Sequence, residues 1–332
     1  MGVVTDRLVT TPGFSVVIAT YQRRERLRMV LERLGRQEYP TDRLEIIVVC
    51  DGCTDGSAEM ARGMKLRFRL QVLEQANAGP AVARNLGLEH ARGPWVLFLD
   101  DDVMPAPSFV GEHALAHGGR KDRVVIGPLL AAPGRARPWV AWEARKLVEQ
   151  YGKMEAGVYE PTPYQFYTGN ASVSLEAVRG VGGFDPQYLR AEDIELALRL
   201  QRSGMHFCFA PSASAIHLAD RSYASWLQAA YQYGHNDVAF ATGATGHSLD
   251  RLTENTEERH PAMRAAIRFG LRHGRARAWI VAAAGVVAAA VPGQIGQWAC
   301  STAFNLEYWR GVSEAMGDET RALALVEGAQ VA

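Results

Sequence analysis

Three consecutive aspartates, Asp100, Asp101 and Asp102, follow an apolar run in the stretch VLFLDDDVMP. Like charges this close repel one another, so a strand end is an unfavourable place for them unless a partner offsets the charge. A hard divalent cation prefers oxygen ligands, and carboxylates at positions i and i+2 of an extended chain project to the same side. Asp100 and Asp102 are therefore the predicted metal-binding pair, with Asp101 pointing away. A solvated acidic turn is the simpler alternative.

Two further segments could contact a nucleotide. Asp51 ends an apolar run in VVCDGCTDGS, where its carboxylate could accept hydrogen bonds from a nucleobase imide or a ribose hydroxyl. It could equally only fix the turn that Asp-Gly favours. Arg84 and Asn85 lie on a predicted helix that begins after Gly79-Pro80. A helix N-terminus and an arginine both suit phosphate or base contacts, although an ordinary surface arginine remains the alternative.

The elements that must position these residues alternate along the first hundred residues. The predicted strands, short apolar runs typical of strands buried on both faces, cover residues 14–21, 44–52, 68–75 and 94–100. The predicted helices cover residues 23–37, 54–64 and 79–91. This alternation predicts a doubly wound, mostly parallel α/β sheet. Because ligands of such sheets bind beyond the carboxyl ends of the strands, the tips that read ATY, CDG and DDD should line one crevice.

The second part of the chain is less regular. We expect a helix over 109–117, a strand over 123–130, a helix over 138–152 and an extended aromatic segment over 158–174. A Gly-rich turn then leads into a helix that ends near residue 204, one or two strands follow, and the chain reads as helical from residue 222. Trp139 and Trp142 could stack on an acceptor, or could be core residues on one helix face. Tyr164, Phe166 and Tyr167 lie in the same region.

Composition narrows the class of protein. The chain has 332 residues, of which 48% are hydrophobic and 22% charged, an ordinary globular balance. Lys and Arg together number 36, as do Asp and Glu, so no global basic field indicates nucleic acid as a partner. The four cysteines form no regular framework, which predicts reduced thiols and a cytoplasmic setting. The N-terminal residues lack the apolar region of a secretory signal.

Taken together, the segments resemble the inverting glycosyltransferases of family 2, which have the GT-A fold. The resemblance rests on SVVIATYQR, VVCDGCTDGS, NAGPAVARNLGL, FLDDDVMP, TGNASVS, VGGFD and AEDIELALRL in this order. It covers Phe14 to His217, about three-fifths of the chain. It implies a GT-A catalytic domain over 1–221, with a nucleotide-sugar half (14–105) and an acceptor half (106–221), followed by a helical region over 222–332.

The resemblance also implies an activity and a role for individual residues. The chain would move a sugar, with inversion, from a nucleoside-diphosphate donor, a UDP-sugar by preference, to a hydroxyl of a glycan, lipid-linked or small-molecule acceptor. The implied nucleotide-sugar contacts are Thr20, Tyr21, Asp51, Arg84, Asn85, Asp100, Asp101, Gly169 and Asn170. The implied ligands of Mn²⁺ or Mg²⁺ are Asp102, Asp100 and His217. Asp193, in the acidic pair with Glu192, would be the catalytic base, although a helix N-terminus would stabilise its anion and weaken it as a base.

Several features bear on alternatives to this assignment. The family often has an acidic pair where this chain reads Cys50-Asp51, which leaves base recognition to the second residue. Cys50 and Cys53 form a CxxC with no second pair, so neither a zinc site nor a redox site is expected. A sugar-nucleotide pyrophosphorylase would need a Gly-rich basic loop where ATYQRRERLR stands, and a dehydrogenase would need GxGxxG there. A catalytically silent sugar-nucleotide-binding or glycan-binding module needs no base, so Asp193 argues against it.

The C-terminal region carries a basic segment next to an uncharged one. Arg264, Arg268 and Arg272 are spaced i, i+4, i+8, and Ala278 to Asn305 contains no charge. The apolar core of this stretch is shorter than the about 20 residues that a membrane span needs. Residues 262–305 could lie on an anionic membrane surface at the inner face of the membrane, which would favour a lipid-linked acceptor. They could equally pack on the catalytic domain or on a partner subunit.

Overall fold

The computed structural model describes residues 13–188, 190–242, 252 and 259–328. The chain divides into two compact units: one comprises 1–130 and 148–218, the other 131–147 and 219–332. The boundary expected near residue 221 lies next to this division. Residues 131–147, which the sequence analysis assigned to the acceptor half, belong instead to the helical unit, because Trp139 and Trp142 pack against its core around Trp226.

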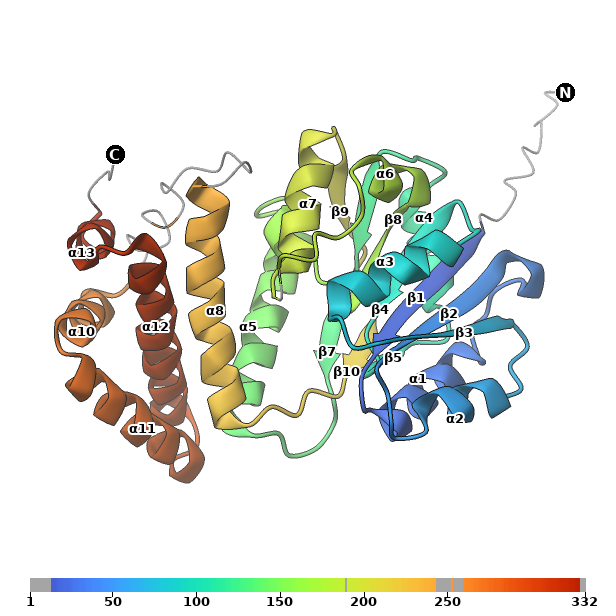
Figure 1. The fold of residues 1–332 in the computed structure, drawn as a ribbon. Helices are drawn as coiled ribbons and strands as arrows, with labels where there is room; N and C mark the ends of the chain where they lie inside the picture. The colour runs from blue at the N-terminus through green and yellow to red at the C-terminus, as the bar shows by residue number, and fades with distance from the viewer. Residues whose placement is uncertain (1–12, 189, 243–251, 253–258, 329–332) are drawn as a thin grey trace, which may run out of the picture. The chain divides into compact units, whose positions relative to one another are not determined.

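A seven-stranded sheet forms the centre of the first unit, in the order β3-β2-β1-β4-β8-β6-β9 (Figure 1). Its strands are β1 (Phe14–Thr20), β2 (Leu44–Asp51), β3 (Arg69–Gln75), β4 (Trp95–Leu99), β6 (Arg123–Ile126), β8 (Asn170–Ser174) and β9 (His206–Phe209). β1 runs parallel to both β2 and β4, and β2 runs parallel to β3. Only β8 breaks the pattern, running antiparallel to β4 and β6. The predicted mostly parallel sheet is confirmed.

Successive side chains of a strand point to opposite faces of the sheet, and here the side chains on both faces are apolar. Helices therefore cover both faces. Val16 and Ile18 of β1 face one core, with α1 (Arg24–Leu34), α2 (Ser57–Gly63) and α4 (Phe109–His117). Val17 faces the other core, with α3 (Pro80–His90), α6 (Leu175–Gly180) and α7 (Glu192–Arg202). Short 3-10 turns, η1 (Thr41–Arg43) and η2 (Pro163–Gln165), precede β2 and β8. This layering brings the carboxyl ends of β2, β1 and β4 to one edge, as expected for a doubly wound sheet.

A second, three-stranded sheet has the order β5-β10-β7, with β5 (Val103–Pro105), β7 (Leu129–Ala131) and β10 (Ala215–His217). The single strand predicted over 123–130 is in fact two strands, β6 and β7, in different sheets. Gly127 and Pro128 separate them, and a Cβ at Gly127 would meet the carbonyl of Ala213. β10 runs antiparallel to β5, which sets His217 opposite Val103, one residue after the aspartate triplet.

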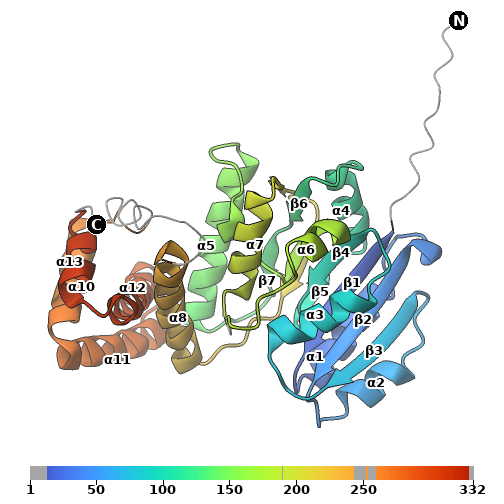
Figure 2. The ribbon, with the colours of Figure 1, turned by 45° about the horizontal axis from the view of Figure 1, so that its top comes forward.

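The second unit is helical, as predicted, and contains the first turns of α5 (Pro138–Glu155), then α8 (Tyr223–Thr242), α10 (Pro261–Arg272), α11 (Gly274–Ala290), α12 (Gln294–Met316) and α13 (Glu319–Val326). Figure 2 shows α12 with α8, α10 and α11 around it. α8 and α12 approach closely at glycines, because a Cβ at Gly234 would meet the Tyr308 carbonyl and one at Gly311 would meet the Tyr231 carbonyl. Among the described residues, no helix is long and apolar enough to cross a membrane.

Candidate active site

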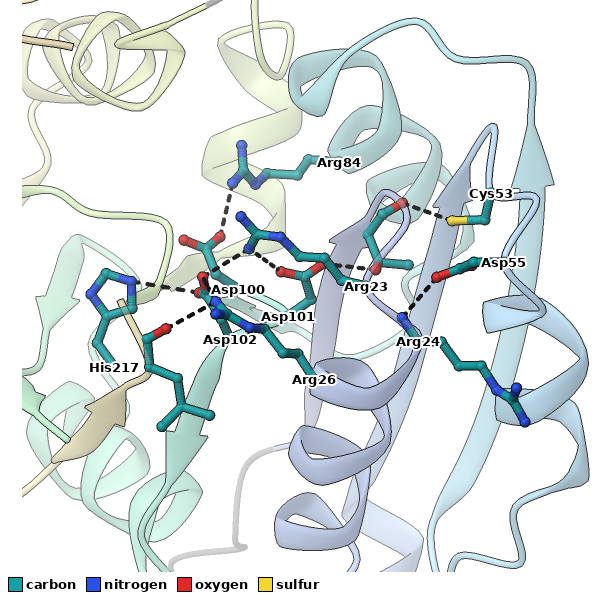
Figure 3. Close-up of polar contacts among 12 residues, drawn as sticks. Arg23, Arg24, Arg26, Cys53, Asp55, Arg84, Asp100, Asp101, Asp102 and His217 are labelled. Carbon is teal, nitrogen blue, oxygen red and sulfur yellow. Dashed lines mark hydrogen bonds and ion pairs between the residues drawn. The ribbon is translucent and has the colours of Figure 1, made fainter. Parts of the chain in front are cut away.

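The aspartate triplet leaves β4 at the edge where β1 ends, and arginines of the chain contact its carboxylates (Figure 3). Asp101 accepts hydrogen bonds from Thr20 Oγ1 at 2.7 Å and from Arg23 Nη1 at 2.8 Å. The same Arg23 nitrogen lies 2.8 Å from Asp102 Oδ2, and Arg26 Nη1 lies 3.4 Å from that oxygen. The repulsion within the triplet is therefore offset by positive charge from the start of α1.

Arg23 and Arg26 are site residues that the sequence analysis missed. Both arginines lie in the segment QRRER, which directly follows the first strand and could have indicated them. In the sequence this segment argued only against a pyrophosphorylase and a dehydrogenase. Burial raises the pKa of Asp101 to about 6, although Arg23 and Thr20 act in the opposite direction. Burial also opposes the charge of Arg23, yet Asp101 and Asp102 outweigh this effect and raise its pKa above the ordinary value.

Asp102 and His217 are the two expected metal ligands that approach each other. The Leu218 amide donates to the Asp102 carbonyl at 2.8 Å, and His217 Nε2 lies 3.6 Å from Asp102 Oδ1. That separation lets both atoms contact one cation with bonds of about 2.1 Å, while Oδ2 stays with Arg23. A carboxylate and an imidazole are donors that Mn²⁺ accepts, so these residues fit a divalent ion. In the described part of the chain, no three His, Cys, Asp or Glu residues form a complete site.

Asp100, predicted to share that ion, is turned toward Arg84 instead. Arg84 Nη2 donates to Asp100 Oδ1 at 2.9 Å, and Arg84 Nη1 donates to Glu192 Oε1 at 2.7 Å. Arg84 and Glu192 are buried, whereas Asp100 is partly exposed. Burial opposes the charge of Arg84, but Asp100 and Glu192 hold its pKa above the ordinary value. Arg84 is thus no surface residue: it joins the end of β4 to the start of α7.

Asp193 lies in the first turn of α7, next to this arginine bridge. Ala191, just before the helix, has φ 59°, a left-handed conformation that an alanine rarely adopts. The Ile194 amide donates to Asp193 Oδ1 at 2.9 Å. Burial, followed by repulsion from Glu192, nevertheless raises the pKa of Asp193 to about 7, against the attraction of Arg84. The expected weakening of this base by the helix N-terminus is therefore outweighed, and its pKa suits proton transfer near neutral pH.

The Asp51 carboxylate is engaged by the chain itself. Its oxygens accept hydrogen bonds from the Ala78 amide at 2.8 Å, the Gly79 amide at 2.9 Å and Gln75 Nε2 at 2.7 Å. Of the two interpretations open from the sequence, the structure supports the turn-fixing one, because Asp51 fastens the loop that leads into α3. Contact of Asp51 with a nucleobase stays a prediction.

Three other residues that were predicted to contact the nucleotide sugar make close contacts within the chain. Asn85 holds the turn before α7 through both the amide and the carbonyl of Phe184, at 2.8 Å each. Asn170 is fully buried and contacts His113 Nε2 at 2.8 Å, together with two backbone carbonyls. Gly169 approaches the site closely, since a Cβ there would lie 3.1 Å from Asp100 Oδ2. Tyr21, by contrast, is exposed at the same edge. That Asn170 lines a sugar site stays a prediction, because all its contacts are internal.

Comparison with known proteins is consistent with this arrangement. The model of glycosyl transferase family 2 matches residues 15–175. Validoxylamine A glucosyltransferase of Streptomyces hygroscopicus subsp. jinggangensis (strain 5008) is 31% identical in an alignment 225 residues long, gaps included, that covers 58% of this chain and 52% of that protein. The chain thus spans about half the length of the curated relatives it matches.

Two solved structures share the fold. Mannosyltransferase PcManGT from Pyrobaculum calidifontis, in complex with GDP-Man and Mn²⁺, is 21% identical with a TM-score of 0.65, over 93% of this chain and 88% of that one. TarS 1-349 of S. aureus, in complex with UDP, is 16% identical with a TM-score of 0.53, over 92% of each chain. At this identity the likeness establishes the GT-A fold alone. Residues 15–175, just under half of the chain, are thus similar to glycosyl transferase family 2.

Proposed function

We propose that this protein transfers a hexosyl group, with inversion, from a nucleoside-diphosphate sugar to an acceptor hydroxyl in a reaction that depends on a divalent metal. The observation that carries the proposal is the chain of ion pairs from Asp100 through Arg84 to Glu192. It joins the edge of the sheet where donors bind to the turn that carries a base of raised pKa, Asp193. A module that only binds sugars has no need of that base.

The chemistry follows from the residues at this edge. Asp193 accepts the proton of the acceptor hydroxyl as its oxygen forms a bond to the anomeric carbon. The bond from that carbon to the diphosphate oxygen breaks at the opposite face, and the nucleoside diphosphate leaves with the electron pair. One displacement inverts the carbon and requires no covalent intermediate. Arg84 holds Glu192 beside the base and Asp100 near the donor, so that both ends of the reaction are positioned together.

A divalent cation, held by Asp102 and His217, would supply positive charge to the departing diphosphate. Arg23 contributes a second positive charge at the same place. Its side chain is half exposed and contacts Asp101 and Asp102 from the solvent side. An incoming diphosphate would therefore meet a guanidinium as well as the metal.

For the donor we propose a UDP-sugar. The related proteins support a nucleotide sugar in general, since the solved structures were obtained with GDP-Man, UDP and UDP-GlcNAc. The curated relative is named a glucosyltransferase, which supports a hexose. The acceptor is a glycan, a lipid-linked sugar or a small molecule, as in the biosynthesis of glycans, glycolipids or secondary metabolites.

Calorimetry with UDP, GDP and dTDP, each with and without Mn²⁺, tests the donor site. We expect one nucleotide to bind in a metal-dependent manner, and Asp102→Ala to remove the metal dependence. Hydrolysis or transfer of the matching nucleotide sugar then tests turnover. Binding without any turnover, across donors and acceptors, would leave the silent binding module as the correct description. No binding of any nucleotide by the folded protein would contradict the donor site itself.

A further inference from the structure

The second unit exposes an apolar face next to a cluster of positive charge. On α11, the outward residues Arg275, Trp279, Ala282, Val286 and Ala290 recur at helical spacing and form one stripe. Trp279 is 79% exposed and Val286 69% exposed. The opposite face, with Val281, Ala284 and Ala288, packs into the core around Trp226. From Ala278 to its end, α11 is therefore apolar all round, which is typical of a helix with both faces covered, yet one face is open.

The exposed apolar surface continues from α11 across the turn into α12. Ile295 is 56% exposed and Trp298 63% exposed in its first two turns. No charged residue lies between Arg277 and Glu307, so this part of the hairpin offers no charged side chain to water. Exposed tryptophans are costly on a free surface, but they suit an interface between water and lipid headgroups.

Positive charge lies at the junction where α10 ends and α11 begins, residues 272–275, which we call the elbow. Arg272 and Arg275 are exposed there, and no ion pair holds either of them within the described residues. Phe269 lies on the other side of the elbow, half exposed, with its ring 4.7 Å from that of His273. From residue 261 to residue 306 the chain has no acidic residue. A basic cluster flanked by exposed aromatic rings has the composition of a surface that binds anionic lipid headgroups.

We propose that this face, formed by the α10–α11 elbow, the outer stripe of α11 and the first turns of α12, docks on an anionic membrane surface. The charge favours a bilayer over a second copy of the chain. A two-fold contact through this face would bury the arginines of each copy against a face that has no acidic residue to pair with them. The face lies on the membrane rather than in it, since no described helix is long and apolar enough to cross.

Vesicle flotation of the full chain tests the proposal, with vesicles of phosphatidylcholine alone or with added phosphatidylglycerol. We expect binding to the anionic vesicles that weakens with salt. Trp279→Glu combined with Val286→Glu should lower the partition coefficient roughly tenfold or more. Arg272→Gln combined with Arg275→Gln should lower it about 25-fold, about fivefold for each arginine. Leu115→Glu, at a 75% exposed position of α4, is the matched control and should bind like the parent protein.

Three outcomes would overturn the proposal. One is no binding of the parent protein to anionic vesicles at low salt, and another is equal binding to both lipid compositions. The third is concentration-dependent self-association that the Trp279/Val286 variant loses, without vesicle binding, because the face would then join copies of the chain. If the glutamate variant fails to fold, the arginine variant decides alone, since both its positions are exposed. Nucleotide binding is measured in parallel, so that failure of the membrane proposal and failure of the proposed activity are separate results.

Discussion

Replacing Asp193 by asparagine should remove activity and at the same time stabilise the fold at alkaline pH. The pKa of this carboxyl rises from 3.8 to about 7 in the folded protein, so the fold favours its neutral form. An acid with a raised pKa contributes stability that is fully present below its unfolded pKa and is lost as the pH rises to its folded pKa. The ionised carboxylate therefore costs about 4 kcal/mol above pH 7, at about 1.4 kcal/mol for each unit. Asparagine has nearly the same shape and carries no charge.

The expected difference between the variant and the parent protein thus depends on pH. Between about pH 5 and about pH 8, the stabilisation of Asp193→Asn relative to the parent should grow by about 2 to 3 kcal/mol. Urea unfolding at several pH values measures it, and Asp42→Asn, at an exposed carboxylate in the same unit, is the control that should show no such trend. Transfer should fall about 10²- to 10⁴-fold, as expected for loss of a general base, while nucleotide binding stays nearly unchanged.

If the proposed activity holds, kcat of the parent protein should fall as the pH drops below about 7, because Asp193 then binds the proton it must be free to accept. Two results would refute the reasoning. A variant that is destabilised equally at all pH values would mean that the carboxylate is not held neutral by its surroundings. A variant that loses nucleotide binding together with transfer would mean that Asp193 belongs to the donor site.

Three further substitutions probe the support of the site and of the helical unit. Arg84→Lys should lower kcat about 10- to 100-fold without abolishing folding, because an ammonium group cannot bridge Glu192 and the donor edge in two directions; steady-state kinetics measure it. Asn170→Ala should destabilise the first unit by about 1 to 3 kcal/mol in urea unfolding, because it leaves buried partners unsatisfied. Gly311→Ala should destabilise the helical unit by about 1 to 3 kcal/mol in thermal unfolding, because its Cβ would meet the Tyr231 carbonyl.

For each of these three predictions, a particular result would contradict it. Unchanged kinetics in Arg84→Lys would mean that the paired contacts of Arg84 with Asp100 and Glu192 play no part in the reaction. Unchanged stability in Asn170→Ala would contradict the structural role inferred from its buried contacts, and a raised KM for the donor would support its predicted place in the sugar site. A neutral effect of Gly311→Ala would mean that α8 and α12 can separate without cost. Gly152→Ala, where a Cβ meets nothing within 4 Å, is the control for the glycine substitution.

The sequence determined the framework of the fold. Continuous apolar runs in β1, β2 and β4 can only be satisfied by burial on both faces, so they predict a parallel sheet covered by helices. The same topology dictates that polar residues after these strands meet at one edge of the sheet, where the aspartate triplet indeed lies. The helical C-terminal region also followed from its periodicity.

The tertiary structure decided the partners of the charged groups and the direction of individual side chains. Arg23 and the aspartates are about eighty residues apart, and their contact depends on how α1 approaches β4. Asn170 points inward because β8 inserts antiparallel between β4 and β6, which a short strand sequence does not specify. The raised pKa of Asp193 likewise comes from burial beside Glu192, not from its position in the sequence. Local sequence fixes periodicity and burial, whereas charge pairing and desolvation depend on which distant surfaces come together.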